Sequence, residues 1–298
     1  MRLTDYELLY DLPVGEYDGR GVDGVRTTTI RAGRSLEVMC YPITRLSREA
    51  TREAKRRRST VAMAKINHRN RERHIMRLLE MNFTERAWVF TGTYAYPVED
   101  YGMCNLKAMT EEYHARKLPW DESRLRKDVR NFIEKVKRRL RKAGGDAKGL
   151  KWVIRFEEGR NPPANGLPPK YHFHAVIEAE GLTRDMLEAC WVKHGSTTIE
   201  KFRLRDDGAA RLARYLCKQK AGGRWWSHSR NLKAPTPRIS DRKMSRRRMA
   251  KVAADVQRDG KAIFEALYPG YKLVELPDPT FSEFVSGCYI YARMRRRD

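Results

Sequence analysis

The order of apolar patterns between residues 87 and 220 constrains the fold of this chain more than any other feature. Residues 87–94 are rich in aromatic and β-branched side chains, which favour a strand. Residues 122–142 repeat apolar side chains at helical spacing and have a basic outer face. Two more strand patterns follow at 151–157 and 170–178, joined by a loop rich in proline and glycine. We expect these two strands to pair antiparallel.

Helical and strand patterns continue to alternate after this pair. The spacing predicts a helix over 182–194, a strand over 198–204 and a helix over 206–220 that ends before two glycines. The whole order is strand, helix, strand, strand, helix, strand, helix. It predicts an α+β fold in which helices pack against a mainly antiparallel sheet.

Two extensions flank this region. Residues 1–60 form a basic N-terminal extension, whose short apolar patches up to about residue 43 indicate an irregular or small β-containing segment. The basic residues 45–80 favour one or two helices. Residues 61–235 would be the central domain, and residues 236–298 a basic helix (about 240–266), a turn and two strand-like runs packed on the core.

Basic residues greatly outnumber acidic ones. The chain of 298 residues contains 62 Lys and Arg against 38 Asp and Glu, which gives a net charge of +24 and a pI near 10.0. An excess of this size and sign indicates a polyanionic partner, and nucleic acid is the leading candidate.

The composition excludes several classes of protein. A hydrophobic content of 41% and an aromatic content of 10% are too high for a wholly disordered chain. The mean hydropathy is −0.74 and no run approaches the roughly 20 apolar residues of a spanning helix, so we expect no membrane partner. The N-terminus lacks a signal-peptide pattern, and five scattered cysteines without a CxxC pair argue against disulfides or a zinc ribbon. A reduced, cytoplasmic location fits best.

The sharpest local pattern is His172-Phe173-His174 within the third predicted strand. Alternate side chains of a strand point to the same face, so both imidazoles would project together and Phe173 would pack on the opposite, apolar face. Two imidazoles on one face are suited to bind a metal ion. The alternative is a pair of polar surface histidines on an edge strand.

An acidic residue at the end of the preceding strand would complete a metal site. Glu157 and Glu158 both lie there, and alternation favours Glu157, because it shares a face with Val153 and Arg155. Two imidazoles and a carboxylate suit a divalent ion with open positions, such as Mg²⁺, Mn²⁺ or Zn²⁺.

The predicted helix over 206–220 places Arg211, Tyr215 and Lys218 on one face, away from its apolar residues. Neighbouring cations favour the phenolate of a tyrosine, and a metal ion held opposite can polarise a phosphate. These are the requirements of a tyrosine nucleophile that attacks a phosphodiester. The alternative is a half-buried tyrosine at the edge of an amphipathic helix.

The order of these motifs resembles that of the HUH endonuclease superfamily, and more specifically the rolling-circle replication initiators of bacterial plasmids and phages. The resemblance runs from about residue 67 to residue 235 and includes FTGTY (90–94), the acidic residue with HFH, and YLCK (215–218). The phrase RWWSHSRNLKAP (224–235) and the late YPGY and YIYARMRR are also similar to that subgroup.

The resemblance implies a five-stranded antiparallel sheet with flanking helices and a divalent metal ion, Mg²⁺ or Mn²⁺. His172 and His174 would be metal ligands, with Glu157 as the third. Tyr215 would nick one DNA strand, leaving a 5′-phosphotyrosine link and a free 3′-OH, and Lys218 would stabilise the phosphate or the phenolate. The implied function is sequence-specific nicking and rejoining of single-stranded DNA to initiate rolling-circle replication of a phage or plasmid.

Two features depart from the best-known members of that family. The motif holds one tyrosine rather than two, so alternation of two tyrosines within one chain is not expected. No GxxxxGK[ST] loop is present, so no helicase is fused to the nuclease. Strand separation at the origin would come from supercoiling or from a host helicase, and a host polymerase would extend the 3′-OH.

Basic and aromatic side chains near the proposed nucleophile suit a single strand, which is held by cations along its backbone and by aromatic stacking on its bases. The expected DNA-binding residues are Arg211, Arg224, Trp226, Arg230 and Lys233. The tryptophans at 225 and 226 could instead belong to the core. Arginine-rich segments at 54–58 and 245–248 would grip phosphates without sequence preference.

Other functions remain open at this point. A conjugative relaxase or a single-strand transposase would use the same chemistry, although relaxases usually place the tyrosine before the HUH motif and small transposases lack the C-terminal extension. A basic nucleic-acid-binding module without catalysis is the alternative from another class. A zinc hydrolase is disfavoured because the chain has no HExxH motif.

Overall fold

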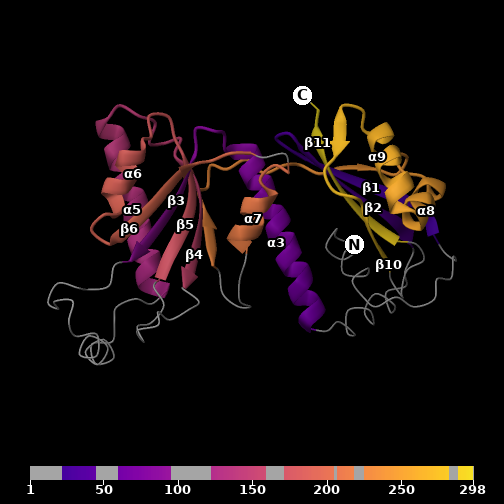
Figure 1. The fold of residues 1–298 in the computed structure, drawn as a ribbon, viewed down its shortest axis with the longest axis horizontal. Coiled ribbons are helices and arrows are strands. Elements are labelled where there is room, and N and C mark those ends of the chain that lie inside the picture. The colour runs from indigo at the N-terminus through magenta and orange to yellow at the C-terminus, as the bar shows by residue number, and fades with distance from the viewer. Residues whose placement is uncertain are drawn as a thin grey trace. The chain divides into compact units, whose positions relative to one another are not determined.

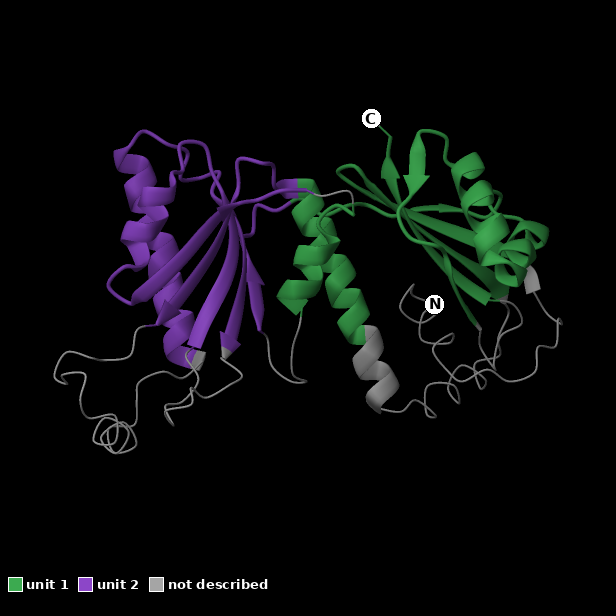
Figure 2. Ribbon diagram, in the orientation of Figure 1, with its two compact units in different colours: residues 1–81, 205–221, 233–298 green, residues 82–204, 222–232 purple. Residues whose placement is uncertain are grey.

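The computed structural model describes residues 22–44, 60–94, 122–158, 171–204, 207–217, 225–281 and 288–297. The chain forms two compact units (Figure 2). Unit 1 contains residues 1–81, 205–221 and 233–298, and unit 2 contains residues 82–204 and 222–232. Within the described ranges, no helix has the length and apolar character needed to span a bilayer.

Unit 2 contains a five-stranded sheet in the order β6-β3-β5-β4-β7. Every neighbouring pair in this sheet is antiparallel. The strands are β3 (Trp88–Tyr94), β4 (Lys151–Glu158), β5 (Tyr171–Glu178), β6 (Gly195–Lys201) and β7 (Trp226–His228). This architecture confirms the predicted α+β fold with a mainly antiparallel sheet.

Two helices cover one face of this sheet, α5 (Glu122–Lys142) and α6 (Arg184–Trp191) (Figure 1). The apolar stripe of α5 buries Phe132 against Phe90 and Phe173 of the sheet, at ring-centroid distances of 4.9 and 5.4 Å. Trp191 of α6 packs edge-on against Phe173 at 4.9 Å. Burial of each such side chain contributes roughly 1.5–3 kcal/mol, so this aromatic layer fixes which face of β5 is apolar.

Unit 1 contains a six-stranded sheet in the order β10-β11-β2-β1-β8, with β9 paired to β11. Its strands are β1 (Val22–Ala32), β2 (Ser35–Thr44), β8 (Arg238–Ser240), β9 (Tyr271–Leu273), β10 (Asp278–Phe281) and β11 (Cys288–Arg296). Its helices are α3 (Thr60–Asn82), whose last residue falls in unit 2, α7 (Ala210–Cys217), α8 (Arg246–Ala254) and α9 (Lys261–Leu267). Leu36, Val38 and Ile290 of the sheet pack with Val252 and Phe264 of the last two helices.

The sheet of unit 1 joins distant parts of the sequence. β2 pairs with β11, and Cys40 lies opposite Ile290. Strands from the predicted regions 1–60 and 236–298 therefore build one sheet together. Helices α3 and α7, which fall largely within the predicted region 61–235, belong to the same unit. Strand patterns are present in the sequence of both extensions, but these patterns do not show that strands of one extension pair with strands of the other.

Three predicted elements differ from the structure. The helix expected over 206–220 begins only at Ala210, because residues 207–209 are not helical. The strand expected at 198–204 lies at 195–201, because Phe202 leaves the ladder, is buried, and donates its N–H to the carbonyl of Ala87 at 3.0 Å. The prediction of a single helix at about 240–266 is wrong, because a π-helical turn, Val256–Gly260, separates α8 from α9. Asp255 has extended backbone angles there, and its side chain accepts a hydrogen bond from the N–H of Arg258 at 2.9 Å.

Candidate metal centre

Strand pairing in unit 2 brings three potential ligands to one face of the sheet. β4 and β5 are antiparallel neighbours, with Glu157 opposite His172 and Arg155 opposite His174. Residues opposite each other in such a pair point to the same face. Phe173, between the two histidines, packs into the aromatic layer on the other face. The predicted projection of both imidazoles from one face is therefore confirmed.

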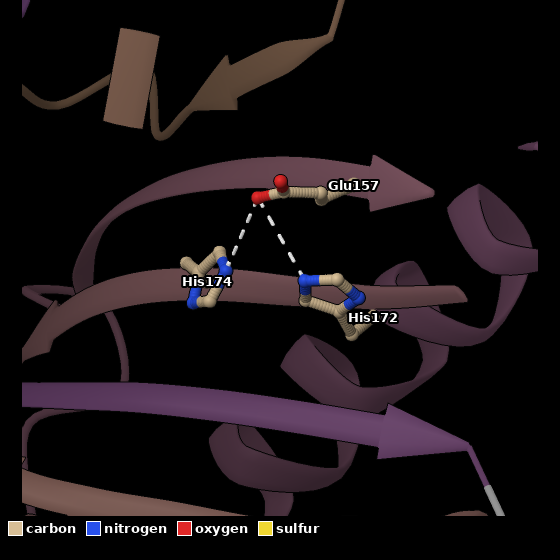
Figure 3. A group of neighbouring side chains, drawn as sticks. All are labelled: Glu157, His172 and His174. Atoms are coloured by element: carbon tan, nitrogen blue, oxygen red, sulfur yellow. Dashed lines mark ion pairs between the residues drawn. The ribbon is translucent and has the colours of Figure 1, made fainter. Parts of the chain in front are cut away.

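The three side chains converge on a small space (Figure 3). Oε2 of Glu157 lies 3.4 Å from Nε2 of His174 and 3.7 Å from Nε2 of His172. One ligand atom from each residue lies within 4.8 Å of the others. Ligands about 2.1 Å from a common ion lie about 3.0–3.4 Å apart at octahedral or tetrahedral angles. The two carboxylate–imidazole separations are close to these values, and the three residues could hold a metal ion.

Thr91 of β3 supports one of these histidines from the adjacent strand. Thr91 lies opposite His174 in the β3–β5 register, and its Oγ1 shares a 2.9 Å hydrogen bond with Nδ1 of that ring. A partner on Nδ1 fixes the ring orientation and leaves Nε2 as the ligand nitrogen. Thr91 was not singled out by the sequence, although it belongs to the FTGTY motif, because its role depends on the register.

A buried arginine lies next to the carboxylate. Arg155 is only 1% exposed, and its Nη2 lies 3.4 Å from Oε2 of Glu157. Burial acts to raise the pKa of Glu157, but a hydrogen bond with His174 and the charge of Arg155 outweigh burial and lower the pKa below its usual value. Glu157 is therefore ionised at neutral pH, as a metal ligand must be.

The short strand β7 adds two aromatic side chains to the same face. Arg155 lies opposite Trp226, and Val153 lies opposite His228. The two rings stack on each other with centroids 5.4 Å apart and planes 26° apart. Trp226, an expected DNA-binding residue, is thus half-buried on the face that holds the triad. The sequence pattern does not predict β7, which is three residues long.

Tyr215 lies on the exposed side of α7. Its side chain is 48% exposed, Arg211 is also exposed, and Ala213 and Leu216 are buried. The predicted amphipathic character of this helix is confirmed. Lys218 lies outside the described residues. Tyr215 belongs to unit 1, whereas the triad belongs to unit 2.

The beginning of α7 is held by a buried carboxylate from α3. Oε1 of Glu80 accepts the N–H of Ala209 at 2.8 Å and lies 3.3 Å from Nη1 of Arg295. A carboxylate at a helix N-terminus satisfies a free N–H and complements the helix dipole. Gly208 has φ +69°, and a Cβ there would lie 1.8 Å from Oε1 of Glu80. The contacts of Glu80 therefore join the helix that carries Tyr215 to both α3 and β11.

Of the remaining predicted DNA-binding residues, some are exposed in the structure and others lie outside the described residues. Arg230 and Lys233 are exposed beyond β7, and Arg246–Arg248 are exposed in the first turn of α8. Arg224 and the segment 54–58 lie outside the described residues, as does the side chain of Glu158.

Comparisons with known proteins identify no relative. No protein-family model matches the chain, and neither curated proteins nor solved structures give a match.

Proposed function

We propose that this protein is a metal-dependent DNA nickase that uses a tyrosine nucleophile. The observation that carries the proposal is the convergence of Glu157, His172 and His174 on one face of the sheet in unit 2. The basic character of the chain supports a nucleic-acid substrate, and Trp226 on the same face can stack on an unpaired base.

The triad would hold Mg²⁺ or Mn²⁺. A divalent ion at this position supplies positive charge that polarises a phosphodiester oxygen. Glu157 contributes the negative charge, the two imidazoles contribute neutral nitrogen ligands, and Thr91 keeps the ring of His174 in its binding orientation.

Tyr215 would attack the phosphodiester. Its phenol oxygen forms a bond to phosphorus while the bond from phosphorus to the 3′ oxygen breaks, and the leaving oxygen takes up a proton. The products are a 5′-phosphotyrosine and a free 3′-OH, and the reverse reaction rejoins the strand. An exposed tyrosine on a helix that also carries the exposed Arg211 is accessible to a DNA strand. Lys218 follows three residues after Tyr215 in the sequence and would stabilise the phosphate or the phenolate.

The biological role that fits this chemistry is initiation of rolling-circle replication of a phage or plasmid in the bacterial cytoplasm. The substrate would be single-stranded or supercoiled origin DNA. A host helicase would separate the strands, and a host polymerase would extend the 3′-OH.

A covalent-adduct assay tests the proposal. The full chain is incubated with the labelled origin strand of its replicon and Mn²⁺, and a denaturing gel detects protein–DNA adducts. We expect an adduct with the wild type and with the control Tyr271→Phe, and none with Tyr215→Phe, His172→Ala or chelator. Tight, salt-sensitive binding without an adduct on the origin strand would instead favour a non-catalytic DNA-binding protein.

A further inference from the structure

A basic cleft lies between α5 and α6 in unit 2, and it has no part in the proposed reaction. Its volume is about 410 Å³. The lining residues are Lys135, Arg138, Arg139, Lys142, Ala189, Cys190 and Lys193. Both helices pack on the face of the sheet that carries Phe173, whereas the imidazoles of β5 project from the opposite face. The cleft and the metal centre are therefore on opposite sides of one sheet.

The cleft is strongly positive. Five of its lining side chains are cationic, and among the described residues that line it none is acidic. Burial raises the pKa of the Cys190 thiol in spite of the nearby cations, so the thiol stays neutral at pH 7. Glu134, on the same helix, is engaged by Lys137 at 2.8 Å and does not line the cleft. An anion is the chemical class that this cleft would bind.

Helix stability alone does not explain this arrangement. Arg139 and Lys142 lie in the last turn of α5, where cations complement the helix dipole. Lys135 and Arg138 precede that turn, and Lys193 follows α6. Lys135 with Arg139, and Arg138 with Lys142, are like charges at a spacing of four residues, which destabilises an isolated helix. An anionic partner would relieve this repulsion.

The length and composition of the cleft favour a particular anion. The eight residues from Lys135 to Lys142 span about 10 Å of helix, which matches about three successive phosphates along one strand of duplex DNA. The described lining contains no aromatic side chain to stack on an unpaired base. Duplex phosphates require cations and no stacking, whereas single strands are usually held by both.

We propose that the α5–α6 cleft binds the phosphate backbone of duplex DNA as a second DNA-binding site, separate from the metal centre. The inference shares with the proposed function only its assumption that the partner is DNA. A duplex bound there leaves the opposite face free, so unit 2 can hold a duplex segment and an unpaired strand together.

The salt dependence of duplex binding tests this proposal. The cleft variant is the full chain with Lys135→Gln, Arg138→Gln, Arg139→Gln and Lys142→Gln. The control variant removes four exposed charges of the same unit outside the cleft: Lys127→Gln, Arg130→Gln, Arg141→Gln and Lys148→Gln. Both variants have the same net charge, and glutamine keeps a helix propensity similar to that of lysine and arginine. Circular dichroism verifies that both are folded.

Binding to a labelled duplex of mixed sequence is measured by fluorescence anisotropy in EDTA over a range of NaCl concentrations. Each lost phosphate contact lowers the slope of log K against log salt by about 0.9, so the cleft variant should lose about 2–3 in slope and the control less than 1. Equal losses in the two variants would overturn the proposal, because charge alone would then account for binding.

Two further arms identify the anion and separate this proposal from the nickase. Inorganic triphosphate should compete only weakly with the duplex. If the cleft variant instead lost triphosphate binding and kept the full duplex slope, the cleft would be a site for free polyphosphate and the proposal would fail. Binding in EDTA does not depend on nicking. The cleft variant should still form the Tyr215 adduct on a single-stranded origin oligonucleotide, so each proposal can fail without the other.

Discussion

Thr91 shows how one side chain outside the triad can set the affinity of the site. Its hydroxyl holds Nδ1 of His174, so Thr91→Val removes that bond and keeps a β-branched residue of similar volume. Loss of such a supporting hydrogen bond typically weakens metal binding 10- to 100-fold. We expect this loss for Mn²⁺ by isothermal titration calorimetry. Thr198→Val, opposite Thr91 on β6, is the matched control and should bind as the wild type does.

His194 gives the structure a predicted pH dependence. Its ring stacks on Trp191 with a centroid distance of 4.6 Å. Burial lowers the pKa of His194 below 6.5, although the nearby Asp128 acts to raise it. The unfolded chain therefore takes up a proton at higher pH than the folded chain, and this contribution to stability is present above about pH 6.5 and is lost as the pH falls through the folded pKa.

An NMR titration of the His194 ring should give a midpoint below 6.5. The urea concentration at the unfolding midpoint of unit 2 should be lower at pH 5.5 than at pH 7.5. This decrease should be smaller in His194→Gln. A normal midpoint for the ring would contradict the prediction.

At the scale of elements, the contact between β3 and β5 aligns the candidate metal ligands. A Cβ on Gly92 would lie 2.5 Å from Cε1 of Phe173, the residue between the two histidines. Gly92→Ala should therefore displace this ring, cost about 1–3 kcal/mol in the free energy of unfolding, and weaken Mn²⁺ binding. Urea unfolding and calorimetry measure the two effects. Gly24→Ala is the control, because its Cβ would meet Ile43 at an ordinary 3.6 Å.

The elements also show which parts of the candidate site can be predicted from the sequence and which cannot. Alternation in residues 171–178 predicted that His172 and His174 share a face, and the nearby end of β4 predicted Glu157, because period and chain order are local properties. Thr91 and His228 escaped prediction because their positions depend on which strands become neighbours and in what register. β7 escaped because three residues carry too little pattern to distinguish a strand from a loop.

At the scale of the whole molecule, a substitution in the core of one unit should lower the stability of that unit and leave the stability of the other largely unchanged. Ile290→Ala removes a fully buried side chain of unit 1 and should cost about 2–5 kcal/mol, and Phe132→Ala should cost about 3–5 kcal/mol in unit 2. Hydrogen exchange measured by mass spectrometry should show faster exchange mainly in β1, β2 and β11 for the first variant and in α5, β3 and β5 for the second. The same loss of protection in both units for either variant would show that they unfold as one.

The domain organisation was the hardest property to predict at this scale. The chain passes between the two units four times, at residues 81–82, 204–205, 221–222 and 232–233. Composition and linkers give no sign of these passages, because they depend on contacts between distant residues. Pairing of β2 with β11 joins the first and last segments, and the hydrogen bond from Ala209 to Glu80 joins α7 to α3. A division into consecutive regions could not reproduce such an arrangement.

The pairing of β2 with β11 has a consequence for folding during synthesis on the ribosome. Cys288 follows Thr44 by about 240 residues. At a synthesis rate of about 5–20 residues per second, the nascent β1–β2 hairpin waits roughly 12–50 seconds for its last partner. During that interval the hydrogen-bonding edge of β2 is a template for other chains. All of unit 2 has left the peptidyl transferase centre by then, so the sheet of unit 2 can fold before the sheet of unit 1 is complete.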